Sequence, residues 1–165
     1  MRRLFLLITF MTVLACAFAQ TNKGGIPAYK ILKPDGSYSR ASDLKKGKLT
    51  MIVYFMPDCP HCQELTKALT ANMARLKDVQ IVMITCTKTE YPYMRLIQDF
   101  QKTYRLTKYK NIVMGSEYPS YLVNDYYGIQ GTPFVALYNK AGEFIKSYLQ
   151  PKGVSEILNE LKKVS

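Results

Sequence analysis

Apolar positions along the chain follow two patterns that alternate. Residues 49–55 and 79–85 are nearly continuous apolar runs, which are typical of strands buried on both faces of a sheet. Residues 63–77, between these runs, predict a helix with one apolar face. The apolar residues of that helix are Leu65, Leu69, Met73 and Leu76. The order strand, helix, strand predicts parallel strands joined by a right-handed crossover.

The second half of the chain continues this alternation and then changes it. A helical apolar stripe follows the second strand, and its members are Tyr93, Leu96, Ile97, Phe100 and Tyr104. A short strand or loop is expected at 111–114, and a short helix at 121–127. Residues 134–138 and 143–149 predict a hairpin, since turn residues separate them. A final stripe, formed by Val154, Ile157, Leu158 and Leu161, predicts a C-terminal helix.

A separate hairpin is expected ahead of the first buried strand. Residues 29–32 read as a strand, and Pro34-Asp35-Gly36 is a turn signal, because Pro presets φ and Gly accepts positive φ. The length of 165 residues suits one domain with its own core. The sequence therefore predicts one α/β domain over residues 28–165, with a central mixed sheet flanked by helices and an N-terminal hairpin extension.

Residues 1–19 are typical of a secretory signal peptide. The segment opens with Arg2 and Arg3, continues with an apolar stretch and ends in an Ala-x-Ala cleavage site at 17–19. Residues 20–27 read as a flexible leader. Two alternatives stay open, namely lipid attachment at Cys16, whose surroundings resemble a bacterial lipobox, and an uncleaved anchor, although the apolar stretch is short for a bilayer span. The chain is therefore expected to be exported, either periplasmic or secreted.

Charge and cysteine content narrow the function classes. The net charge of +11 comes from dispersed lysines rather than an arginine-rich tract, which is typical of a solvated surface. A nucleic-acid role fits an exported chain poorly, while attraction to an anionic membrane surface or an acidic partner stays open. Export permits disulfides. The cysteines left after cleavage at 19 are few and odd in number, so packing must supply the core.

Cys59 and Cys62 stand two residues apart, between the first buried strand and the helix. Such a pair can bind a metal, form a structural disulfide or carry out redox chemistry. A structural zinc site needs about four ligands, and after cleavage at 19 the only further histidine and cysteine are His61 and Cys86. A bridge across two residues constrains the unfolded chain little. Redox chemistry accounts best for the pair, and a metal-delivery or metal-binding module remains the alternative.

The local sequence favours a reactive thiolate at Cys59. Pro60 suits the first helical position, which makes Cys59 the N-cap and turns its sulfur toward free N–H groups and the positive end of the helix dipole. His61 would add to this effect if charged. Asp58 would oppose it, or help to cap the helix. Cys62, about one turn further on, is placed to resolve a mixed disulfide on Cys59.

These residues resemble the thioredoxin superfamily. The resemblance rests on Cys59-Pro60-His61-Cys62 between a strand and a helix, on Gly131-Thr132-Pro133 before a hairpin, and on the C-terminal helix. Residues 29–48 are similar to the lead-in of exported TlpA/ResA-like members. The resemblance implies a thioredoxin-like fold and a thiol–disulfide oxidoreductase that acts on protein dithiols or disulfides. It also implies a redox partner protein that recycles the dithiol, and no diffusible cofactor.

The resemblance assigns further roles. Pro133 would be the family's cis-proline, packed opposite Cys59, and the backbone of Thr132 would pair with an extended substrate. The Pro-His dipeptide resembles strongly oxidising periplasmic members, whereas the overall build resembles exported reductases. Reduction is slightly favoured, and a disulfide-donating oxidase on the same fold is the alternative.

Some positions depart from the family pattern. The chain has no tryptophan, although the family's loop before the first cysteine contains one. Val53 and Tyr54 occupy the region where the family buries a carboxylate, so the proton of Cys62 needs another acceptor. Cys86 ends the second buried strand, and it is expected either near the dithiol, at the carboxyl edge of the sheet, or as a buried thiol.

Overall fold

The structure of the chain is a computed structural model that describes residues 24–164, so the expected signal peptide and Cys16 lie outside the described residues. Its strands are β1 (Lys30–Leu32), β2 (Tyr38–Arg40), β3 (Leu49–Tyr54), β4 (Val79–Thr85), β5 (Ile112–Ser116), β6 (Phe134–Tyr138) and β7 (Phe144–Leu149). Its helices are α2 (Pro60–Ala71), α3 (Met73–Leu76), α4 (Tyr93–Thr103), α5 (Leu122–Tyr127) and α6 (Val154–Lys163), with 3-10 turns η2 (Ala41–Asp43) and η3 (Leu106–Lys108).

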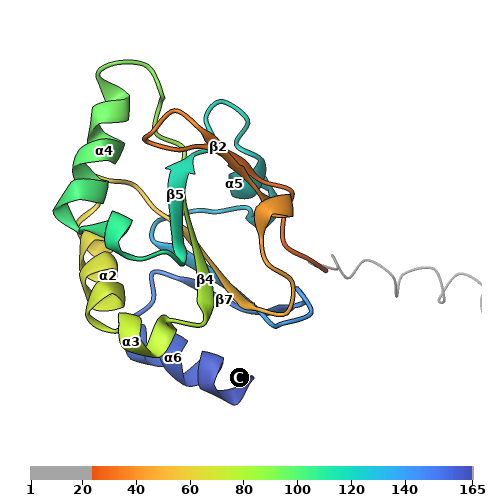
Figure 1. Cartoon of the computed structure of the whole chain (residues 1–165). Helices are drawn as coiled ribbons and strands as arrows, with labels where there is room; N and C mark the ends of the chain where they lie inside the picture. The colour runs from red at the N-terminus through yellow and green to blue at the C-terminus, as the bar shows by residue number, and fades with distance from the viewer. Residues whose placement is uncertain (1–23, 165) are drawn as a thin grey trace, which may run out of the picture.

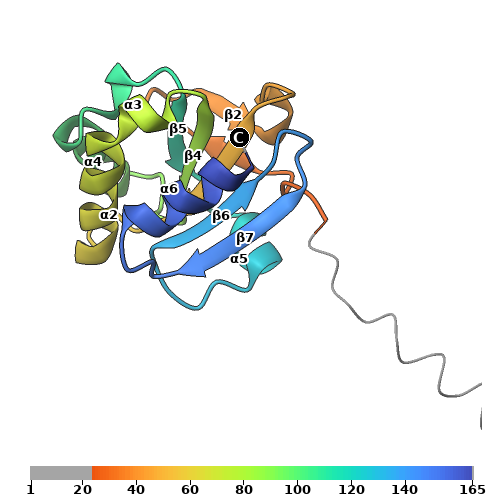
Figure 2. The ribbon, with the colours of Figure 1, turned by 90° about the horizontal axis from the view of Figure 1, so that it is seen from below.

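The strands join in one mixed sheet with the order β2-β1-β5-β4-β3-β6-β7. Helices α2, α3, α4 and α6 lie over one face of the sheet, and α5 lies over the other (Figure 1). Seen from below, α6 lies across the sheet beside β6 and close to α2 (Figure 2). This layered arrangement confirms the predicted α/β fold with a mixed central sheet.

The strand directions bring several loops to one edge of the sheet. Strands β3 and β4 run parallel, with Tyr54 beside Ile84, so residues 55–59 and 86–92 leave the sheet at the same edge. Strand β6 runs antiparallel to β3, and Phe134 at its start lies beside Tyr54. The residues just before β6 therefore return to the edge from which the loop after β3 departs.

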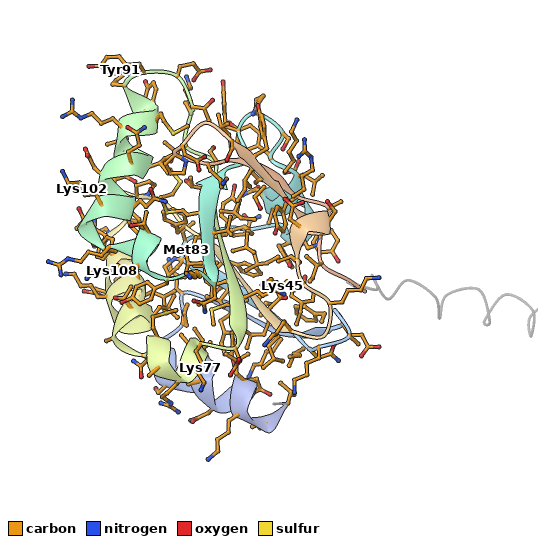
Figure 3. All side chains as sticks on the ribbon, viewed as in Figure 1. Lys45, Lys77, Met83, Tyr91, Lys102 and Lys108 are labelled. Carbon is orange, nitrogen blue, oxygen red and sulfur yellow. The ribbon has the colours of Figure 1, made fainter. Side chains whose placement is uncertain are left out.

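The sheet separates two apolar cores. Successive strand residues point to opposite faces, so Val53 packs under the helices α2, α4 and α6, while Tyr54 packs on the side of α5. Met83 belongs to the first core, and Figure 3 places it in the interior between the sheet and the helices. Every residue of β3 is buried, as its continuous apolar run predicts.

The expected N-terminal hairpin is present and extends the main sheet. Strands β1 and β2 pair antiparallel around the predicted turn, and Leu32 of β1 lies beside Ser116 of β5. Gly115 makes this approach possible, because a Cβ at that position would lie 2.5 Å from the Leu32 carbonyl oxygen. The segment at 111–114, for which strand and loop were both open, belongs to strand β5.

The helix predicted over residues 63–77 is not continuous. It begins at Pro60 and breaks at Asn72, whose backbone leaves the helical region with φ −109° and ψ 15°. The Asn72 side-chain amide donates to the carbonyl of Ala68 at 2.9 Å. Asparagine side chains compete in this way with the helical backbone bonds, so the helix resumes as the separate short helix α3.

The apolar face predicted for the next helix is too wide. Ile97 and Phe100 are buried, but Tyr93 is 43% exposed and Leu96 is 47% exposed. Helix α4 meets the core through a narrow side only, and the Lys88 ammonium lies over the Tyr93 ring at 5.5 Å. A periodic apolar pattern therefore overstates what this helix buries.

The basic side chains point outward from separate segments. Figure 3 places Lys45, Lys77, Lys102 and Lys108 in different parts of the molecule. All four are exposed. Across residues 24–164, no helix has the length and apolar character that a bilayer crossing requires.

Candidate functional site

The loop between β3 and α2 fixes the position of Cys59. A turn closes with a hydrogen bond from the Cys59 N–H to the Met56 carbonyl at 3.2 Å, and the Cys59 carbonyl accepts from the Gln63 N–H at 3.0 Å. The Gln63 side chain returns to the Pro57 carbonyl at 3.0 Å. Cys59 is the N-cap in an extended conformation, and Pro60 occupies the first turn. These bonds hold the Cys59 sulfur over the start of the helix.

The Cys59 thiol is tuned toward ionisation. Burial works to raise its pKa, but several hydrogen bonds outweigh burial and lower the pKa of Cys59 below its ordinary value. They come from the thiol and N–H of Cys62, from the Thr132 side chain and from the His61 N–H. These N–H groups are the ones that a helix start leaves unpaired. A thiolate at this position is stabilised before any substrate arrives.

Cys62 has the opposite properties. Its side chain is 0% exposed and packs in the core under the helices. Burial is the main cause that raises the pKa of Cys62 to about 12, and its neighbour Cys59 raises it further. Both residues are free thiols. The pair therefore combines a partly exposed sulfur that ionises readily with a buried sulfur that keeps its proton.

The segment before β6 lies against Cys59. The Cys59 sulfur is 3.7 Å from the carbonyl oxygen of Thr132, which is 73 residues away in sequence. The peptide bond between Thr132 and Pro133 is cis, and Pro133 is buried. The antiparallel pairing of β6 with β3 accounts for this approach, because it returns residues 132–133 to the edge where Cys59 begins its helix.

His61 and Asp58 lie outside this contact. The His61 side chain is 71% exposed, and its Nδ1 is 3.7 Å from a carboxylate oxygen of Glu64. Asp58 is exposed. The backbone N–H of His61, rather than its ring, acts on the Cys59 pKa. Among residues 24–164, no three His, Cys, Asp or Glu side chains gather as a ligand set for a metal ion.

The sequence of this chain matches a known family over most of its length. The sequence model for the thioredoxin-like domain matches residues 41–162. The chain belongs to the thioredoxin-like domain family. The fold predicted from the cysteine motif and the Thr132-Pro133 segment is thereby confirmed. Among curated proteins, no sequence matches the chain.

Solved structures share the thioredoxin-like fold at low sequence identity. A secreted disulfide oxidoreductase of Mycobacterium tuberculosis, described as homologous to Escherichia coli DsbE, superposes with a TM-score of 0.66 and 18% identity, over 82% of this chain and 96% of that chain. The exposed lipoprotein thioredoxin of Streptococcus pneumoniae gives 0.62 and 22%, over 82% and 98%. The thioredoxin domain of a Bacteroides vulgatus thiol-disulfide oxidoreductase gives 0.65 and 21%, over 86% and 96%.

Tyr54 stands in the region where the family buries a carboxylate, and it contacts a buried carboxylate from elsewhere in the chain. Its hydroxyl donates to a carboxylate oxygen of Glu117 at 2.8 Å, and both side chains are buried. Glu117 also accepts from the N–H groups of Val123 and Asn124, at 2.7 and 3.1 Å. Burial, followed by the Glu117 charge, raises the pKa of Tyr54, so the phenol keeps its proton. This carboxylate lies on the α5 side of the sheet, opposite Cys62.

Cys86 is connected to the loop that carries Cys59 through a contact with Met56. It is half-buried and packs against the core on the α5 side. Its sulfur lies 3.6 Å from the Met56 sulfur, and Met56 also accepts from the Thr85 hydroxyl at 3.7 Å. Met56 thus fastens the loop that carries Cys59 to the end of β4. The sequence placed Cys86 at the correct edge of the sheet, but it gave no signal for Met56.

A groove runs beside the dithiol. Its volume is about 410 Å³. The polar residues at its rim are His61, Glu64, Gln150 and Lys152, and Pro133 and Leu65 contribute to its apolar lining. Residues from the start of α2 and from the loop after β7 meet here. Of these groove residues, only His61 and Pro133 were predicted from the sequence as site residues, whereas Glu64 on α2 and Gln150 from a distant strand end were missed.

Proposed function

We propose that this chain is an exported thiol–disulfide oxidoreductase that exchanges disulfides with protein substrates through Cys59 and Cys62. The observation that carries the proposal is the contrast between the two thiols. Cys59 is partly exposed with a lowered pKa, whereas Cys62 is buried with a raised one. A nucleophile needs an accessible sulfur with a lowered pKa, as Cys59 has. A resolving thiol reacts only after the mixed disulfide has formed, and the burial and raised pKa of Cys62 suit that role.

In the reductive direction the electrons move in two steps. The Cys59 thiolate attacks one sulfur of a substrate disulfide, a bond forms between Cys59 and that sulfur, and the other substrate sulfur leaves as a thiolate. Cys62 then loses its proton and attacks the Cys59 sulfur, which releases the second substrate thiolate. The substrate gains two electrons, and the protein is left with a Cys59–Cys62 disulfide. A partner dithiol protein reduces this disulfide again, and no diffusible cofactor takes part.

Other residues have supporting roles in this proposal. Thr132 offers its backbone to an extended substrate segment, and Pro133 keeps that backbone next to the Cys59 sulfur. Pro60 sets the helix start, and His61 tunes Cys59 through its N–H. Asp58 lies beside the motif as an exposed charge that opposes ionisation. The similar structures of a secreted protein and of an exposed lipoprotein support export. We propose cleavage after residue 19, and lipid attachment at Cys16 is the alternative.

Disulfide donation is the second candidate, and one observation favours it. The N–H groups that lower the Cys59 pKa stabilise the thiolate, and the thiolate exists only in the reduced protein. Stabilising the reduced form raises the reduction potential and makes the disulfide a better oxidant. The resemblance of the overall build to exported reductases points the other way, and we keep reduction as the first candidate.

Reduction of insulin tests the activity itself. The wild type and Cys86→Ser should reduce insulin, Cys59→Ser should be inactive, and Cys62→Ser should accumulate a mixed disulfide with substrate. Equal activity of wild type and Cys59→Ser would refute the proposal. The direction is decided by the reduction potential of the Cys59–Cys62 couple against glutathione. A potential well below that of glutathione supports the reductase, and one near or above it supports the oxidase.

A further inference from the structure

The carbonyl group of Thr132 is already occupied in the substrate-free protein. Its oxygen accepts a hydrogen bond from the side-chain amide of Gln150 at 3.3 Å, and the Cys59 thiol lies 3.7 Å from the same oxygen. A carbonyl oxygen has two lone pairs. The Gln150 amide therefore uses one acceptor position of Thr132, and the Cys59 thiol uses the other only until it ionises, although the proposed function requires this backbone to pair with a substrate.

The backbone around Gln150 is fixed by the sheet. Leu149 lies beside Phe134 at the end of the β6–β7 ladder, and the Gln150 N–H continues the ladder to the Pro133 carbonyl at 2.8 Å. Gln150 has a positive φ of 48°, which is uncommon for a residue with a side chain. This conformation ends strand β7 and leaves the Gln150 side chain within reach of Thr132.

The Gln150 amide covers the side of the loop that faces solvent. Its hydrogen bond to Thr132 is exposed, whereas the contact with Cys59 is partly buried. The amide nitrogen also lies 3.5 Å from the place where a Cβ on Gly131 would sit. A peptide strand that approaches Thr132 from solvent therefore meets the Gln150 side chain first.

We propose that Gln150 is a positioning residue that covers the substrate-pairing carbonyl of Thr132 and releases it when a peptide substrate binds. This inference rests on the proposed function, because it concerns how that same site receives its substrate. The substrate class is an extended peptide segment next to a disulfide, whose backbone N–H takes the place of the Gln150 amide. The released side chain can turn into the adjoining groove, which it already lines.

Gln150→Met tests the inference. Methionine has a similar length and the same limitation at positive φ, but it has no N–H to donate, so the substrate no longer displaces a hydrogen bond. KM for a peptide disulfide should fall about two- to tenfold, which is the range expected for one exposed hydrogen bond, while kcat stays the same. Gln150→Asn should behave alike, because asparagine tolerates a positive φ and its amide is one methylene too short to reach Thr132.

A matched control separates this effect from general loss of an amide. Gln130 donates to the Gly128 carbonyl at the same distance of 3.3 Å, in the same loop, without contacting Thr132. Gln130→Met should leave KM unchanged. Reduction of 2-hydroxyethyl disulfide, which has no backbone N–H, should be unaffected by either substitution.

The outcomes that would overturn the inference are specific. If Gln150→Met and Gln150→Asn leave KM for the peptide unchanged or raise it, Gln150 does not compete with substrate. A fall of KM for 2-hydroxyethyl disulfide as well would also overturn the inference, since that substrate cannot pair with Thr132. These results leave the wild-type exchange activity intact, and so differ from failure of the proposed function. An inactive wild type would overturn both.

Discussion

Cys59 and Cys62 should differ widely in their reaction with iodoacetamide, because alkylation requires a thiolate. The rise in the pKa of Cys62 from 9.0 to about 12 reduces its thiolate fraction at pH 7 about a thousandfold. Cys59 has a lowered pKa and a partly exposed sulfur. We therefore expect Cys59 to be alkylated alone at pH 7, while Cys62 remains unmodified over the same period.

The measurement uses reduced Cys86→Ser protein, so that only the two motif thiols of residues 24–164 react. Peptide mapping by mass spectrometry after timed alkylation from pH 5 to 9 gives a rate profile for each sulfur. The Cys59 rate should level off at a lower pH than that of a cysteine peptide. Its midpoint is the better measure, because thiolates of low pKa are also weaker nucleophiles.

Denaturation supplies the control for this experiment. In 6 M guanidinium the two sulfurs should react at similar rates, since burial and the helix start are both lost. The reasoning is refuted if native Cys62 reacts within about tenfold of Cys59 at pH 7. It is equally refuted if the Cys59 profile has its midpoint at or above that of the cysteine peptide.

Two substitutions outside the cysteines test the surroundings of the site. Tyr54→Phe removes a buried hydrogen bond to the Glu117 carboxylate. It should lower the free energy of unfolding by about 1.5–3 kcal/mol, which calorimetry would record as a fall in Tm of about 5–10 °C. The control Tyr38→Phe, at a ring that is 50% exposed, should leave Tm almost unchanged, and equal shifts for the two variants would contradict the assignment. His61→Ala keeps the N–H that acts on Cys59 and removes only an exposed ring. It should therefore change the Cys59 alkylation rate less than about fivefold, and a larger drop would show that the ring itself stabilises the thiolate.

The parts of the fold that follow from local patterns could be predicted from the sequence. A strand covered on both sides needs apolar residues throughout, so the apolar run at 49–55 predicted a buried strand, which the structure has as β3 over residues 49–54. Pro60 marked the first helical turn and thereby placed Cys59 at the N-cap. Both predictions depend only on neighbours in sequence.

Features that depend on distant partners could not be predicted in this way. The helix breaks at Asn72 because the Asn72 side chain hydrogen-bonds to the Ala68 carbonyl, although the apolar stripe continues past this residue. Gln150 meets Thr132 only after β7 has paired with β6. Tyr93 fits an apolar period, although its side chain is 43% exposed. The period records which side chains lie on one helix face, and packing decides how much of that face is buried.

The position of Tyr54 changes how proton transfer from Cys62 is understood. The sequence indicated that the strand before the motif carries no carboxylate, and the structure has a buried one, Glu117, on the far side of the sheet with three hydrogen-bond donors. Within residues 24–164, Glu117 is the buried carboxylate, so Cys62 has no buried carboxylate on its own side of the sheet to take its proton. The first step of exchange helps, because the Cys59 charge, one cause of the raised Cys62 pKa, disappears in the mixed disulfide. Burial, the larger cause, remains, so the departing substrate thiolate is the acceptor best placed to take the proton.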